Sequence, residues 1–191
     1  MRLLFLYWNY YHKMLNKNNG EKYLQYISDI HLEKKKNKPS DILGNFIKIQ
    51  PYSKGHSYLA LLGDIGNPYM TNYNNFLEYH AKIFEHIFVI SGNHEYYTSK
   101  KKQYTIENIE EEIKKICDQY ENITYLQKSK IQIGQTLFIG CTLWSNISKV
   151  QNIAYDSIND YSNIYVKNDH QEEERILIKD SYIHGQKKYR I

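Results

Sequence analysis

The sequence predicts an α/β protein in which largely parallel strands form a central layer covered by helices. Short apolar runs recur along the chain and are closed by turn residues, and segments of helical period lie between them. Strands that alternate with helices in this way are typical of layered α/β folds. The chain has 191 residues, of which 41% are hydrophobic and 24% charged, so one globular domain is expected.

The expected strands are short and end in turn-forming residues. The two at Tyr58–Leu62 and Ile87–Ile90 hardly alternate between apolar and polar positions, which is typical of strands buried on both faces. A hairpin is expected around Gly134-Gln135, between the runs 131–133 and 137–139. The remaining predicted strands are Tyr23–Ile27 and Ile123–Leu126.

Two helices are expected between these strands. In Asn72–His86, apolar residues recur every three or four positions and predict a helix. A second helix is expected to begin after Thr105, whose hydroxyl suits an N-cap, and its buried stripe would consist of Ile106, Ile109, Ile113 and Ile116. From Ser145 onward the patterns are weak.

The ends of the chain and its two cysteines fit a cytoplasmic protein. We expect residues 1–21 to be an N-terminal extension and residues 22–191 to form the domain. No small-residue cleavage site follows the short apolar stretch near the start, and no run approaches the roughly 20 apolar residues of a membrane span. Cys117 and Cys141 match no metal or redox spacing, so both are expected to be buried free thiols.

The charge is mildly basic, at +4 with a pI near 8.8. It suits an anionic substrate, but it does not by itself indicate nucleic acid, which is expected only as a phosphodiester substrate. The lysine-rich stretches 33–40 and 99–103 are interpreted as solvated loops, with steering of an anion as the alternative.

Metal-binding residue types follow three of the predicted strands. Asp29 and His31 follow the first, Asp64 the second, and Asn93 and His94 the third. Taken singly, each is most often a turn or a surface residue. The carboxyl ends of parallel strands meet at one edge of a sheet, however, so these five side chains are expected to converge.

This set of oxygen and nitrogen donors suits manganese, iron or zinc. Asp64 lies between the other two motifs in sequence, and a carboxylate in that position can bridge two metals about 3.5–4 Å apart. Gly63 and Gly92 would let the backbone turn sharply and approach closely.

The motifs Asp29-Ile30-His31, Gly63-Asp64 and Gly92-Asn93-His94-Glu95 resemble those of the calcineurin-like metallophosphoesterase superfamily. The flanking sequences GDIGNP and GNHEYY are similar to a subgroup of small stand-alone phosphohydrolases. The resemblance covers the chain from about Tyr23 to its end, loosely over the last part, and implies the layered metallophosphoesterase sandwich.

The resemblance also implies a phosphatase-like chemistry with a dinuclear metal site. Asp29 and His31 would hold one divalent metal, Asp64 would bridge both, and Asn93 would bind the second metal and the phosphate. A metal-bridging hydroxide would attack phosphorus in line. His94 would stabilise the transition state or protonate the leaving oxygen. Glu95 is expected to be a supporting carboxylate.

The sequence departs from the family pattern in two places. The family carries an Asp that orients the catalytic histidine where this chain has Asn67, so His94 would be a weaker acid–base group or would have another carboxylate partner. The later histidine and the Gly-His-x-His motif have no counterpart, and His170 and His184 are not expected to be ligands. The stretch 177–186 resembles the helix before the missing histidine strand.

These departures imply a fold that is incomplete at its C-terminus, with an incomplete second metal site. Three explanations stay open: a gene fragment, a split protein completed by a second chain, or a degenerate homologue. Three functions are therefore considered: a phosphoester hydrolase, which leads; an inactive metal-binding or scaffold remnant; and a nucleic-acid-binding protein, which ranks last.

Overall fold

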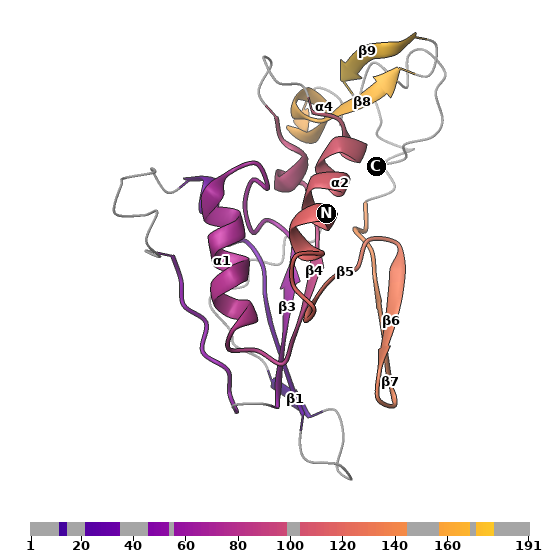
Figure 1. The fold of residues 1–191 in the computed structure, drawn as a ribbon. Coiled ribbons are helices and arrows are strands. Elements are labelled where there is room, and N and C mark those ends of the chain that lie inside the picture. The colour runs from indigo at the N-terminus through magenta and orange to yellow at the C-terminus, as the bar shows by residue number, and fades with distance from the viewer. Residues whose placement is uncertain are drawn as a thin grey trace. The chain divides into compact units, whose positions relative to one another are not determined.

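Five strands form the central sheet, in the order in which they occur along the chain (Figure 1). Strands β2 to β5 are parallel, which confirms the predicted α/β class, and β1 is antiparallel to β2. The strands are β1 (His12–Met14), β2 (Tyr23–Ile27), β3 (Ser57–Leu62), β4 (His86–Ile90) and β5 (Ile123–Tyr125).

The structure is a computed structural model of the 191-residue chain. It describes residues 12–14, 22–34, 46–53, 56–98, 104–144, 157–168 and 171–177. The chain consists of two compact units. The sheet unit comprises Arg2–Glu95 and Glu112–Thr142, and the second unit contains Tyr96–Glu111 and Leu143–Ile191.

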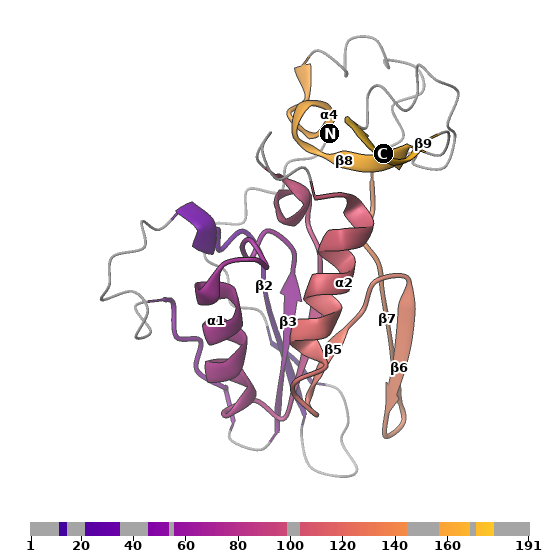
Figure 2. The same ribbon diagram turned by 45° about the horizontal axis from the view of Figure 1, so that its top comes forward.

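Helix α1 (Thr71–Ala81) and the part of α2 (Ile106–Cys117) from Glu112 onward cover one face of the sheet. Consecutive parallel strands joined by right-handed crossovers place their helices on the same face, and both views show the helices in front of the strands (Figures 1 and 2). The Tyr120 hydroxyl, just after α2, donates to Asn74 Oδ1 of α1 at 3.1 Å. The helical layer therefore holds together across the two crossovers.

A hairpin covers the other face of the sheet. It consists of β6 (Ser129–Ile133) and β7 (Thr136–Gly140), joined by the expected two-residue turn, in which Gly134 has a φ of 58°. Phe138 of β7 stacks on Phe88 of β4 with ring centroids 4.2 Å apart. The sheet is thus sandwiched between helices and a hairpin, and its strands β3 and β4 are buried on both faces as predicted.

Helix α1 ends five residues earlier than the sequence predicted. The backbone N–H groups of Ile83 and Phe84 both donate to the carbonyl of His80 and close the last turn. The Asn122 amide donates to the carbonyls of Ala81 and Phe84, at 2.8 and 3.0 Å, and satisfies groups that a continuing helix would have paired. The apolar period beyond Ala81 therefore belongs to a turn and to β4.

The cap of α2 was predicted correctly. Thr105 Oγ1 accepts the Asn108 N–H at 3.5 Å, and Asn108 Oδ1 accepts the Thr105 N–H at 3.2 Å, which is a reciprocal capping arrangement. Both residues lie in the second unit. That unit also contains α4 (Asp160–Asn163) and the antiparallel pair β8 (Tyr165–Asn168) and β9 (Gln171–Leu177), for which the sequence carried no clear signal.

Residues 12–14 of the expected extension 1–21 form β1, which pairs with the sheet edge at β2. The expectation for the two cysteines needs correction. Cys117 is a buried free thiol, and burial raises its pKa to about 12, but Cys141 is only half-buried. The loop 99–103 and nearly all of 177–186 lie outside the described residues. Within the described ranges, no helix combines the length and apolarity needed to cross a membrane.

One buried histidine ties α1 to the segment before β3. His80 is fully buried; its Nε2 accepts the Ile49 N–H at 3.0 Å, and its Nδ1 lies 2.7 Å from the Phe76 carbonyl. These bonds fix a neutral imidazole with the proton on Nδ1. Burial lowers the pKa of His80 from 6.5 to about 4.

We expect His80 to make the fold acid-sensitive. Because its folded-state pKa is lowered, its contribution is complete above pH 6.5 and is lost as the pH falls toward 4. The loss is about 3 kcal/mol. Urea unfolding at pH 7.5 and 4.5 would show the wild type losing more stability than His80→Gln. Parallel losses in the two proteins would contradict this role.

Candidate metal centre at the carboxyl edge of the sheet

The first two motifs are held side by side because the pairing of β2 and β3 continues beyond both strands. The Asp29 N–H donates to the Gly63 carbonyl at 3.1 Å, and the His31 N–H donates to the Asp64 carbonyl at 2.9 Å. One residue further on, Leu32 N–H donates to the next carbonyl of the β3 loop at 2.8 Å. These backbone bonds bring Asp29 and His31 next to Asp64.

Three of the predicted ligands have a left-handed backbone. The φ angles are 58° for Asp29, 50° for His31 and 55° for Asp64. Asp and His enter this region more readily than most residues, but each instance still costs roughly 1–3 kcal/mol. Such strained positions cluster at functional sites, where the surrounding structure holds a side chain in a required direction.

Two glycines let the loops after β3 and β4 approach each other closely. A Cβ at Gly63 would lie 2.5 Å from the Gly92 backbone nitrogen, and a Cβ at Gly92 would lie 2.2 Å from Asp64 Oδ1. Any side chain at either position would separate the loops. The close approach allows the His94 N–H to donate to Asp64 Oδ1 at 2.9 Å.

Glu95 joins the same two loops through its carboxylate. Oε1 accepts the N–H groups of Ile65 and Gly66, at 2.6 and 3.1 Å, and Oε2 accepts those of Asp64 and Gly92, at 2.9 and 2.7 Å. Glu95 is 1% exposed, and this burial raises its pKa to about 7, whereas the N–H donors favour the ionised form. The predicted supporting role of Glu95 corresponds to this arrangement.

The side chains of Asp29, His31 and Asp64 form a set that fits a divalent cation. One donor atom from each lies within 4.8 Å of the others, and the set consists of two carboxylates and an imidazole. Asp29 is exposed and the other two are half-buried, so the set is open to solvent. Burial and the nearby Asp29 charge raise the pKa of Asp64, while the His94 N–H lowers it. A cation would relieve this crowding of negative charge.

Asn93 and His94 come from the turn after β4. Asn93 is half-buried, and its backbone is fixed on both sides, because Gly92 bonds Glu95 and His94 bonds Asp64. The His94 ring lies against the His31 ring with centroids 4.5 Å apart. The structure therefore brings His94 next to the predicted metal ligands.

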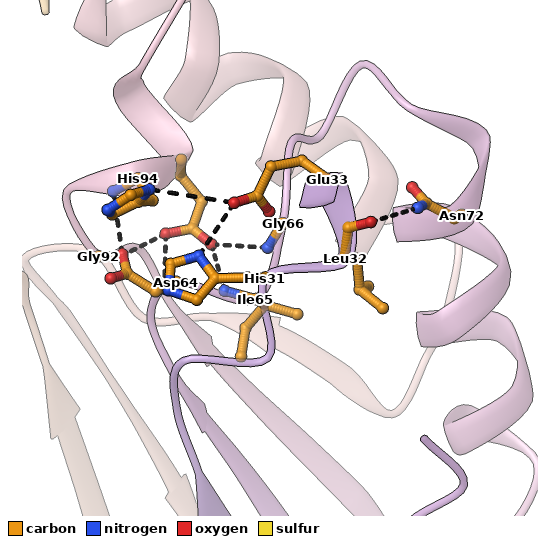
Figure 3. A network of polar contacts seen from close by, with 10 residues as sticks. His31, Leu32, Glu33, Asp64, Ile65, Gly66, Asn72, Gly92 and His94 are labelled. Carbon is orange, nitrogen blue, oxygen red and sulfur yellow. Dashed lines mark hydrogen bonds and ion pairs between the residues drawn. The ribbon is translucent and has the colours of Figure 1, made fainter. Parts of the chain in front are cut away.

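Glu33 also belongs to this cluster, although its sequence context indicated a solvated loop. Its Oε1 lies 2.9 Å from His31 Nδ1 and 3.9 Å from His94 Nδ1, as Figure 3 shows. These three residues form a second set whose donor atoms lie within 4.8 Å of one another. In the sequence, the lysines after Glu33 made it look like part of a solvated loop. Its position two residues after His31 was the one feature that could have indicated its place in the cluster.

Asn67 stands where the family pattern has an Asp that orients the catalytic histidine, but its hydrogen bonds are to its own turn. Its Oδ1 accepts the Tyr69 N–H at 2.9 Å and its carbonyl accepts the Met70 N–H at 3.0 Å, so it shapes the turn before α1. His170 and His184, which were not expected to be ligands, lie outside the described residues.

Donor groups gathered at the carboxyl ends of parallel strands lie where α/β proteins bind their ligands, and comparison with known proteins identifies the family. A family model described as calcineurin-like phosphoesterase matches residues 26–187. The chain therefore belongs to the calcineurin-like phosphoesterase family, as its motifs indicated.

Two similar proteins extend this result. An uncharacterised protein of Acanthamoeba polyphaga mimivirus is 34% identical over 174 residues, which cover 83% of this chain and 57% of that protein. The crystal structure of phosphopantetheinyl hydrolase from Mycobacterium tuberculosis matches with a TM-score of 0.51 at 16% identity, over 85% of this chain and 59% of that chain. The second likeness shows the shared fold. The chain thus spans somewhat more than half the length of either protein.

Glu95→Gln is expected to loosen both loops. A glutamine offers one acceptor oxygen, and its NH₂ would face two of the four N–H donors. At pH 8, where Glu95 is ionised, the free energy of unfolding should fall by about 3 kcal/mol. Urea unfolding checks this value, with the exposed Glu78→Gln as the control, which should change it by less than about 0.5 kcal/mol. Equal stability of the two variants would contradict the role of Glu95.

Gly92→Ala is expected to displace Asp64 and weaken metal binding. The added Cβ would collide with the Asp64 side chain and with its backbone nitrogen, 2.6 Å away. Calorimetric titration with Mn²⁺ should show a Kd raised at least about ten-fold. Gly134→Ala is the control, because a Cβ added there would meet no atom within 4 Å, and the strain from its φ of 58° stays in the β6–β7 turn. Unchanged Mn²⁺ affinity in Gly92→Ala would refute the close packing described here.

Proposed function

We propose that the protein hydrolyses a phosphoric ester with the help of two divalent cations. The observation behind this proposal is the convergence of Asp29, His31 and Asp64 from two separate strand ends, with donor atoms within 4.8 Å of one another. Membership of the calcineurin-like phosphoesterase family supports the same reaction class. The candidate metals are manganese, iron and zinc, because the donors are carboxylates and imidazole.

Each residue has a part in this proposal. Asp29 and His31 would hold one cation, Asp64 would lie between the two, and Asn93 would hold the second through its amide oxygen and contact the phosphate. When bound, the cations supply a nucleophile at neutral pH and neutralise charge on the phosphoryl oxygens. The half-open position of the cluster leaves room for an anionic substrate.

His94 is the proposed catalytic residue. Hydrolysis forms a bond from a water oxygen to phosphorus and breaks the ester P–O bond, and the leaving oxygen then needs a proton. The His94 backbone is fixed by its bond to Asp64, and its ring lies beside His31, so it can deliver that proton and regain one from solvent. Its positive form would also stabilise the negative transition state.

Asp64→Asn tests the reaction directly. With Mn²⁺ and 4-nitrophenyl phosphate or bis(4-nitrophenyl) phosphate, the full chain should release nitrophenolate, and the variant should lose about 10²-fold or more. Chelation with EDTA should abolish the wild-type rate. The control is Asp118→Asn, the same substitution at an exposed carboxylate paired with Lys114, which should leave the rate unchanged.

The other outcomes separate the alternatives. Tight Mn²⁺ binding without turnover of either ester would favour the non-catalytic metal-binding protein over the hydrolase. Turnover that persists in Asp64→Asn would place the chemistry elsewhere and refute the proposed site.

A further inference from the structure

The cluster contains one carboxylate to which the proposed mechanism gives no task. Glu33 directs Oε1 at two histidines, at 2.9 Å from His31 Nδ1 and 3.9 Å from His94 Nδ1 (Figure 3). Its Oε2 is buried and makes no hydrogen bond within the described part of the chain. Removing a carboxylate from water costs free energy unless hydrogen-bond donors replace the lost water, and here the nearby donors are the two imidazole rings.

The contact with His31 determines which ring nitrogen is available to a cation. An ionised carboxylate only accepts hydrogen bonds, so His31 Nδ1 must carry the proton in the 2.9 Å contact. In the neutral ring, Nε2 then keeps its lone pair. Histidines that bind metals commonly donate their other N–H to a carboxylate in this way, which fixes the ring and strengthens the ligand.

The contact with His94 brings negative charge to the proposed acid. The distance of 3.9 Å is too long for a hydrogen bond, but it places the carboxylate directly beside the His94 ring nitrogen. Asn67 is neutral and bonds the backbone of its own turn, whereas the Glu33 carboxylate lies beside both rings (Figure 3).

Hydrogen bonds on both sides hold the backbone around Glu33 in place. Leu32 is 1% exposed, its N–H donates to the Ile65 carbonyl, and its carbonyl accepts the Asn72 amide at 2.9 Å. On the other side, the Lys34 N–H donates to the His31 carbonyl at 3.0 Å. Glu33 is therefore fixed in a short helical turn, η1 (Leu32–Lys34), anchored to both the β3 loop and α1.

We propose that Glu33 is a positioning residue for both histidines: it holds His31 with Nε2 free for the cation and supplies the carboxylate partner of His94. The second part rests on the proposed hydrolytic function, whereas the first requires only metal binding. The two parts can therefore be tested separately.

The first test measures metal binding and the His31 ring, without catalysis. Calorimetric titration of the full chain with Mn²⁺ should show a Kd about 10–100-fold higher for Glu33→Ala. Glu33→Gln, which keeps an acceptor, should recover most of that affinity. In ¹⁵N NMR spectra, His31 should carry its proton on Nδ1 in the wild type and in Glu33→Gln, and lose this preference in Glu33→Ala.

The matched control is Glu112→Ala, since the side chain of Glu112 is 26% exposed against 23% for Glu33 and pairs with a nearby lysine. It should bind Mn²⁺ like the wild type. Wild-type affinity and an unchanged His31 proton in Glu33→Ala would overturn the first part. If Glu33→Ala does not fold, the wild-type spectrum decides: a His31 proton on Nε2 in the wild type overturns the assignment.

The second test measures the leaving-group dependence of kcat. Phenyl phosphate needs a proton on its leaving oxygen far more than 4-nitrophenyl phosphate does. Glu33→Gln should therefore lose on the order of 10²-fold with phenyl phosphate and less than about ten-fold with the nitrophenyl ester. Equal losses with both esters would overturn the second part, and a wild type without turnover would instead refute the proposed function while the metal-binding test still stands.

Discussion

The bonds from four backbone N–H groups to the Glu95 carboxylate are the constraint on which the rest of the centre depends. They join the loop after β3 to the loop after β4 beyond the last paired residues of these two strands, Leu62 and Ile90. A neutral side chain could not satisfy four donors, and a charged one is tolerated in this buried position only because it is fully hydrogen-bonded. The rigid junction then fixes Asp64 and His94 relative to each other.

The strained backbone of the ligand residues is tolerated because of this junction and because β2 and β3 stay paired beyond their ends. Asp29, His31 and Asp64 all take left-handed conformations, which an isolated turn would avoid. Backbone hydrogen bonds from Asp29 and His31 to the β3 loop hold the two segments in register. The sheet therefore brings three donor groups together, although the backbone conformation of each residue is locally unfavourable.

Electrostatics at the centre follow from the same geometry. Asp29 and Asp64 repel each other, and burial adds to the cost of the Asp64 charge. Glu33 brings a further carboxylate, which faces both imidazoles. Such an accumulation of carboxylates and histidines is poorly suited to a purely structural role and well suited to a site that receives cations. The family membership of the chain agrees with that conclusion.

The amino-acid sequence alone predicted the succession of strands and helices along the chain and the candidate ligand motifs, because these depend on local hydrophobic period and on turn residues directly after apolar runs. The α/β class, the strand positions and the Thr105 cap were predictable on that basis. Tertiary structure decided the end of α1, where the Asn122 side chain from a distant loop satisfies the last carbonyls. It also decided which groups Glu33 and Glu95 contact, because most of those partners lie on other segments of the chain. Local pattern describes what a residue is next to in sequence, whereas the charge balance of a site depends on which loops the sheet brings together.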